Sequence, residues 1–159
     1  MTFRRVLTVS LLLFVAASIV TLVGKELAGK PSPTGSAPGI LPGTPPDGRQ
    51  LVAYYFTGRV RCSSCRKIEA VSRETIEKSF PKELACNRLR FLVVNVDQPE
   101  NRHFVEEFRL ESSSLLLVEM HNGKLLEWKN LSDVWILVED DSKLEKYVRD
   151  EVASLLERI

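Results

Sequence analysis

The stretch Leu51-Val-Ala-Tyr-Tyr-Phe-Thr-Gly-Arg-Val-Arg-Cys-Ser-Ser-Cys65 decides the fold class predicted for this chain. Its beginning, Leu51–Phe56, is a compact run of β-prone residues and predicts a buried strand. After the cysteines, apolar residues recur at roughly helical spacing until Pro81 ends the pattern, namely Ile68, Val71, Ile76 and Phe80. Cys62 and Cys65 therefore lie at a predicted turn from a strand into a helix.

The residues after Pro81 continue this alternation of strands and helices. In chain order they predict a strand at Leu89–Val96, a short helix around Glu100–Leu110, strands at Leu115–Met120 and Lys124–Trp128, a short helix around Ser132–Glu139, and a last helix. Asn122-Gly123 between two apolar runs is a strong hairpin signal. Ser142-Lys-Leu-Glu145 is a capping box that predicts the start of the last helix. The expected order is β-α-β-α-β-β-α, an α/β fold.

Residues 1–28 predict a membrane anchor. Val6–Gly24 contains no charged residue, and a helix of this length, at about 1.5 Å per residue, comes close to the thickness of a bilayer's hydrocarbon core. Ala16-Ala17-Ser18 lies inside the apolar run, so cleavage there would leave the rest attached; a cleaved signal is the alternative. Arg4 and Arg5 before the span favour an inside N-terminus. We expect a single-pass protein of the cytoplasmic membrane whose domain faces the extracytoplasmic (periplasmic) side.

A change of composition separates this anchor from the rest of the chain. Residues 29–48 contain six of the eight prolines and five of the eight glycines, with almost no large apolar side chain. Such a segment buries too little surface to offset its ordering entropy, which predicts a disordered linker. Residues 49–159 then form a single domain of ordinary size.

Charge and cysteine content narrow the function classes. The formal net charge is +1, from 22 basic and 21 acidic residues, so no global field attracts nucleic acid and we expect no nucleic-acid partner. Three cysteines are too few for a disulfide-stapled scaffold, and an odd number leaves one unpaired within the chain.

Three segments of the domain resemble the thioredoxin family: the strand that leads into Cys62-Ser-Ser-Cys65, the strand end Val94-Asn-Val-Asp-Gln98, and the hairpin around Asn122-Gly123. This resemblance implies a thioredoxin-like three-layer fold, with a mixed sheet and helices on both of its faces. Within the superfamily the sequence is similar to the ArsF-type proteins, known as nitrophenyl-compound nitroreductase subunits. The phrases that carry this similarity are Tyr54-Tyr-Phe56, Cys62-x-x-Cys-x-x-Ile-Glu69, Asn95-Val-Asp-x-Pro-Glu-Asn101 and Trp128-Lys-Asn-Leu131. Nothing in the sequence predicts a flavin or nicotinamide site, and we expect no cofactor besides the redox-active cysteine pair.

The chemistry of the pair follows from its place before a helix. A thiolate, not a thiol, attacks a disulfide. Free backbone N–H groups and the positive end of the helix dipole point at the sulfur of Cys62, and Cys65, one turn later, reaches back to release a bound partner. Four nearby cations add a positive field: Arg59, Arg61, Arg66 and Lys67. We therefore expect Cys62 to be the nucleophile and Cys65 the resolving thiol of a thiol–disulfide oxidoreductase or electron relay that acts on a disulfide-bearing protein partner.

Other interpretations of the pair remain open. Two thiolates, with a histidine as a further ligand, would suit Cu(I) or zinc, but spacing reveals no third ligand, and we assign no metal ligand. A static structural disulfide in a redox-inert adaptor is another alternative. The resemblance implies, for the redox interpretation, electrons from a membrane dithiol carrier of the cytochrome-c-biogenesis type.

Two departures from the thioredoxin pattern concern the surroundings of the cysteines. Thioredoxins present a cis-proline loop to the pair just before the third strand, and the matching place here is Ser112-Ser113-Ser114. We expect Ser113 and Ser114 to line the partner groove, with trans peptide bonds. Thioredoxins also bury a carboxylate in the first strand, where this chain has Tyr54-Tyr-Phe56. No carboxylate base is evident, and Tyr hydroxyls are poor substitutes at neutral pH.

The remaining candidate residues have simpler explanations. Cys86 is predicted to be a small buried residue, with an intermolecular disulfide as the alternative. His103 and His121 are predicted to be surface residues. Trp128 and Trp135 are predicted to be core aromatics.

Overall fold

The computed structural model describes residue 45 and residues 47–159. The predicted anchor, residues 1–28 with the span Val6–Gly24, lies outside the described residues, as does most of the predicted linker at 29–48. Within the described part, no helix is both long enough and apolar enough to cross a membrane.

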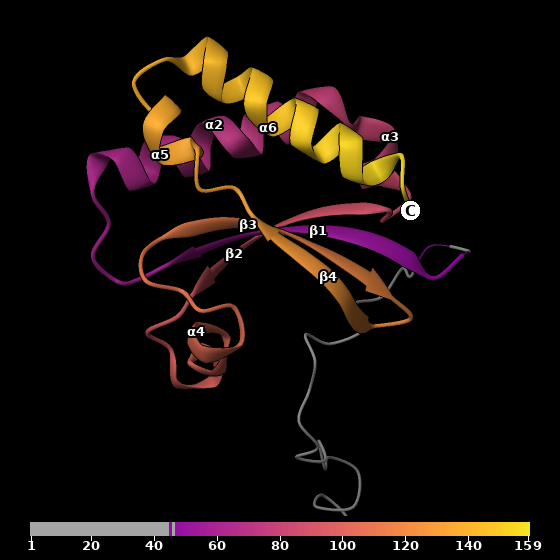
Figure 1. Cartoon of the computed structure of the whole chain (residues 1–159), viewed down its shortest axis with the longest axis horizontal. Coiled ribbons are helices and arrows are strands. Elements are labelled where there is room, and N and C mark those ends of the chain that lie inside the picture. Colours follow the sequence, from indigo (N-terminus) through magenta and orange to yellow (C-terminus); the bar gives the residue numbers. More distant parts are fainter. Residues whose placement is uncertain (1–44, 46) are drawn as a thin grey trace, which may run out of the picture. The chain divides into compact units, whose positions relative to one another are not determined.

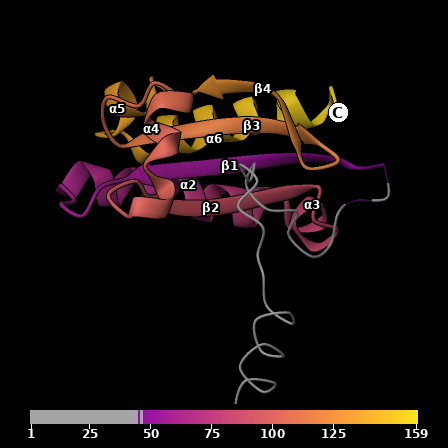
Figure 2. The same ribbon diagram turned by 90° about the horizontal axis from the view of Figure 1, so that it is seen from below.

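Four strands form one mixed sheet in the order β2-β1-β3-β4. The second strand from the edge, β1 (Arg49–Thr57), pairs in parallel with β2 (Leu89–Asn95) and antiparallel with β3 (Ser114–His121). The outer strand β4 (Lys124–Asn130) pairs antiparallel with β3, and Figure 2 shows the four strands side by side. Because β1 has a neighbour on each side and cover on each face, every residue from Leu51 to Thr57 is buried. This explains its unbroken apolar run.

Helices cover both faces of this sheet (Figure 1). In chain order they are α2 (Ser63–Ser79), α3 (Pro81–Ala85), the 3-10 turn η1 (Pro99–Asn101), α4 (His103–Glu107), α5 (Val134–Leu137) and α6 (Asp141–Leu156). Helices α2, α3, α5 and α6 lie on one face, and α4 lies on the other. The described domain therefore has the α/β architecture expected from the sequence, a mixed sheet with helices on both faces.

Alternate residues of β1 supply two hydrophobic cores, because successive side chains of a strand point to opposite faces. Leu51, Ala53 and Tyr55 belong to the larger core, which α2, α5 and α6 cover. Val52, Tyr54 and Phe56 belong to the smaller core beneath α4, where Phe104 and Phe108 pack on them. The strand that precedes the cysteines is thus held on both sides, which fixes the point at which the chain leaves the sheet for α2.

Two predicted helix boundaries differ from the structure. Pro81, expected to end a helix, also begins the short helix α3, because a proline in the first turn loses no hydrogen bond there. Helix α6 begins at Asp141, and its N-cap is Asp140, whose carboxylate accepts a hydrogen bond from the N–H of Lys143 at 3.1 Å. The predicted capping box that begins at Ser142 is therefore wrong: the carboxylate of Asp140 takes the position that the Ser142 hydroxyl was expected to fill.

The predicted hairpin is confirmed. Asn122 and Gly123 have φ of 51° and 76°, as a two-residue turn between strands of right-handed twist requires. The N–H of Asn122 donates to the carbonyl of Gly48 at 2.8 Å. Gly48 itself has φ of 71°, so the chain enters β1 through a left-handed residue that packs against this hairpin.

Candidate redox site

The cysteine pair lies where the chain leaves strand β1 and enters helix α2. The parallel strands β1 and β2 end at the same edge of the sheet, and a short loop leads from the end of β1 to Cys62. The start of α2, the start of β3 and helix α5 come together at this end of the domain (Figure 1). Segments far apart in the sequence therefore meet at the end of the domain where α2 begins.

The two sulfurs are bonded to each other and have different environments. Cys62 and Cys65 form a disulfide with 5.0 Å between their Cα atoms. Cys62 is the N-cap of α2, and its sulfur accepts a hydrogen bond from the N–H of Cys65 at 3.0 Å. Cys62 is exposed to solvent, whereas Cys65 is only 7% exposed. An attacking sulfur needs access and nearby groups that favour a negative charge, and Cys62 is exposed and has the N–H of Cys65 beside its sulfur.

The four cations around the pair have unequal partners. The guanidinium of Arg61 forms an ion pair with Glu69, and Lys67 forms one with Asp141 at 2.8 Å. Arg66 donates to the carbonyl of Arg61 at 2.9 Å and forms no ion pair with a described residue. Carboxylates thus compensate two of the cations that the sequence placed near Cys62. Arg59 and Arg66 form no ion pair with a described residue, so these two cations and the helix terminus are the positive groups of this segment that no carboxylate pairs with.

A tyrosine from β1 contacts the turn that carries Cys65. The hydroxyl of Tyr55 donates a hydrogen bond to the carbonyl of Cys65 at 2.7 Å, and its side chain is fully buried. Burial raises the pKa of Tyr55 above its ordinary value, and the positive charge of Arg61 and a hydrogen bond with Ser113 only partly oppose this. The hydroxyl is therefore neutral at physiological pH and acts as a hydrogen-bond donor rather than as a base.

The serine loop expected to face the cysteines lies at this end of the sheet. Ser114 is the first residue of β3 and pairs in register with Phe56 of β1. The hydroxyl of Ser113 lies 3.4 Å from that of Thr57, the last residue of β1. All peptide bonds of the described residues are trans, as expected for the serine loop. The loop is thereby tied to the strand that leads to the pair.

Two residues that shape the site were missed in the sequence. The carboxylate of Asp97, just after β2, accepts the N–H of Arg59 at 2.7 Å and so holds the loop between β1 and Cys62. The indole N–H of Trp135, on α5, donates to the carbonyl of Ser113 at 3.1 Å. The sequence could have predicted the place of Asp97, because it follows a strand parallel to β1 and parallel neighbours end at the same edge of a sheet. No local pattern points from Trp135 to Ser113.

Other candidate residues lie away from the pair, and two predictions are wrong. Cys86 ends α3 and is exposed instead of buried, because α3 is a single surface turn without buried residues. Trp128 is 36% exposed instead of lying in the core, because it is on the outer strand β4. His103 is exposed, as predicted. Among the described residues, no three of the side chains of His, Cys, Asp and Glu are grouped so that they could hold a metal ion.

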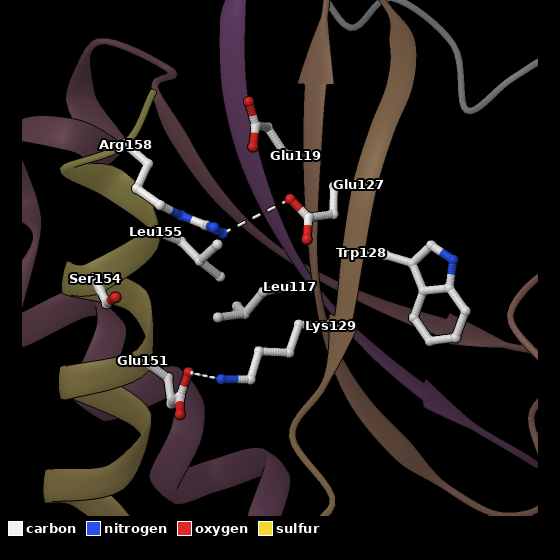
Figure 3. Close-up of a pocket in the computed structure, with 9 residues that line it drawn as sticks. All are labelled: Leu117, Glu119, Glu127, Trp128, Lys129, Glu151, Ser154, Leu155 and Arg158. Atoms are coloured by element: carbon white, nitrogen blue, oxygen red, sulfur yellow. Dashed lines mark hydrogen bonds and ion pairs between the residues drawn. The ribbon is translucent and has the colours of Figure 1, made fainter.

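A hollow of about 350 Å³ lies between β4 and the last turns of α6 (Figure 3). Leu117 and Leu155 form part of its lining, which also carries the ion pair of Lys129 with Glu151 at 2.6 Å. Arg158 reaches towards Glu127, at 3.9 Å. Neither cysteine of the disulfide lines it. This hollow is therefore separate from the candidate redox site.

No family model matches this sequence, and no curated protein matches it. Among solved structures, the thioredoxin of Fasciola hepatica has 22% sequence identity, with 59% of this chain and 80% of that chain covered and a TM-score of 0.37. The oxidised thioredoxin of Plasmodium falciparum has 21% sequence identity, with 62% of this chain and 82% of that chain covered and a TM-score of 0.37. The thioredoxin of Trypanosoma brucei brucei has 24% sequence identity, with 65% of this chain and 76% of that chain covered and a TM-score of 0.38. The α/β fold of this domain is instead shown by its own sheet order, β2-β1-β3-β4.

Proposed function

We propose that this protein is a thiol–disulfide oxidoreductase or electron relay that works through Cys62 and Cys65. The observation that supports this most is the asymmetry of the disulfide. One sulfur is exposed at a helix N-terminus and accepts a backbone N–H, and the other is buried one turn later. A disulfide that only ties a loop needs neither the exposed sulfur nor the helix terminus.

The exchange balances without any further reagent. In the reduced protein the thiolate of Cys62 attacks one sulfur of a partner disulfide, a new S–S bond forms, and one partner thiolate leaves. Cys65 then loses its proton to solvent or to the departing thiolate, attacks the sulfur of Cys62 and displaces the second partner thiolate. Two electrons pass to the partner and the Cys62–Cys65 disulfide remains. The reverse sequence oxidises a partner dithiol.

We further propose that the domain is an ArsF-type, membrane-anchored module on the periplasmic side. The supporting features are the uncharged run Val6–Gly24, the arginines before it and the Pro/Gly-rich segment 29–48. On that side of the membrane a dithiol carrier within the bilayer would supply the electrons, and a disulfide-bearing protein would receive them. Fractionation and protease treatment of cells with opened outer layers test this placement. A soluble domain without its first residues, or one shielded in the cytoplasm, contradicts it.

The redox assignment is tested with single cysteine variants in the full-length chain. Cys62→Ser should abolish exchange with a model disulfide, because the attacking sulfur is gone. Cys65→Ser should accumulate mixed disulfides with partner proteins, because the resolving thiol is gone. Cys86→Ser is the matched control and should behave like the wild type. If the wild type itself shows no exchange, the domain is a redox-inert adaptor and the proposal fails. The proposal also fails if Cys62→Ser exchanges as fast as the wild type.

A further inference from the structure

The hydroxyl of Tyr55 reaches the cysteine pair from the sheet. Tyr55 is fully buried in the larger core, and its hydroxyl donates to the carbonyl of Cys65 at 2.7 Å. This carbonyl belongs to the first turn of α2, which contains Cys65 and follows its N-cap, Cys62. The bond therefore joins the middle of the domain to the turn on which the two sulfurs meet.

A bond at this place limits how far the turn can move. A carbonyl oxygen has two lone pairs, so that of Cys65 can serve the helix and Tyr55 together. In the oxidised protein the disulfide itself holds the two sulfurs together. That bond is absent while Cys62 is joined to a partner. At that stage Cys65 has to find the sulfur of Cys62 again, and a fixed backbone makes this encounter more frequent.

We propose that Tyr55 is a positioning residue for the resolving step: its hydroxyl fixes the first turn of α2 so that Cys65 stays within reach of Cys62. This role rests on the exchange reaction proposed above. Tyr55 is fully buried and therefore out of a partner's reach, and its hydroxyl acts through the backbone carbonyl of Cys65. The first step, the attack by Cys62 on the partner, does not depend on it.

The same strand offers a matched control. Tyr54 is the neighbour of Tyr55 on β1 and is 2% exposed, but its ring faces the smaller core, where it stacks on Phe56 with 5.3 Å between ring centroids. A change of either tyrosine to phenylalanine removes one hydroxyl from a buried ring of the same strand. Only the change at Tyr55 removes a hydrogen bond to the cysteine turn.

The experiment follows the two steps separately with 5,5′-dithiobis(2-nitrobenzoate) and the reduced full-length protein in detergent. Both tyrosine variants and the protein used as the wild type in this assay carry Cys86→Ser, because that exposed thiol would also react. Attack by Cys62 releases one coloured thiolate, and attack by Cys65 on the resulting mixed disulfide releases a second. Tyr55→Phe should leave the first rate unchanged and slow the second about fivefold, the effect of one ordinary hydrogen bond. Tyr54→Phe should leave both rates unchanged.

The outcomes separate this inference from the proposed function. If the wild type releases no second thiolate, the exchange reaction itself is refuted, and the role of Tyr55 with it. If the wild type releases both but Tyr55→Phe keeps the second rate, only the positioning role is refuted. It is also refuted if Tyr55→Phe slows both steps alike, or if Tyr54→Phe slows the second step as much. Urea unfolding of both variants checks that each is folded under the assay conditions.

Discussion

Reduction of the Cys62–Cys65 disulfide should change the stability of the domain by an amount that depends on pH. The two cysteines are three positions apart, and closing so short a loop removes unfolded-chain entropy worth about 2 kcal/mol at room temperature. At acidic pH the thiols of the reduced protein are neutral and add little stability to replace that of the disulfide. The oxidised form should therefore be more stable by about 2 kcal/mol near pH 5.

The difference should become smaller as the pH rises. An unperturbed thiol loses its proton near pH ~8.5. In the folded domain the helix N-terminus and the N–H of Cys65 favour the thiolate of Cys62. The reduced folded state then binds fewer protons than the reduced unfolded state, so its stability rises with pH, and this gain is complete above the unfolded thiol's range. A stabilising interaction of about 1 kcal/mol between the helix N-terminus and the Cys62 thiolate would halve the stability difference between the oxidised and reduced forms near pH 9.

Urea unfolding followed by tryptophan fluorescence measures this directly, with and without a phosphine reductant at both pH values. With a slope of about 2 kcal/mol per molar urea, reduction should lower the midpoint by about 1 M at pH 5 and by about half as much at pH 9. The double variant Cys62→Ser/Cys65→Ser is the control and should not respond to the reductant. A difference that grows with pH would refute the assignment of Cys62 as the stabilised thiolate, and a reduced form that is more stable at pH 5 would refute the stabilisation by loop closure.

Three further changes test particular contacts. Asp140→Ala should lower the urea midpoint by roughly 0.5 M because it removes the N-cap of α6, whereas Ser142→Ala should not; equal effects would contradict the observed cap. Gly48→Ala should destabilise the domain by at least about 1 kcal/mol, because φ is +71° and the new Cβ would meet the side chain of Asn122; an unchanged midpoint would contradict this. The exposed thiol of Cys86 should react with iodoacetamide in the native oxidised protein, giving one added group by mass spectrometry; a need for denaturant would show that it is covered.

Local pattern in the sequence was enough to predict the four strands and the longer helices of the domain, but not α3. The buried strand before Cys62, the helix after Cys65 and the Asn122-Gly123 hairpin each depend on residues within a few positions of one another. The position of the pair at a strand-to-helix turn followed from the same patterns. Boundaries were less accurate, as at Pro81, because a short surface helix such as α3 has too few residues to produce a periodic signal.

Only the tertiary structure decided what surrounds the cysteines. The sequence placed four cations near Cys62, but the folding of α2 against the start of α6 pairs Lys67 with Asp141, which leaves less positive charge at the sulfur. The hydroxyl of Tyr55 and the indole of Trp135 meet their partners because β1, β3 and α5 converge at one end of the sheet. Such contacts join residues far apart in the chain, and no local periodicity encodes them. The sequence thus determined where the cysteine pair lies in the order of strands and helices, and the packing of distant segments determined how the two cysteines are held and how exposed each of them is.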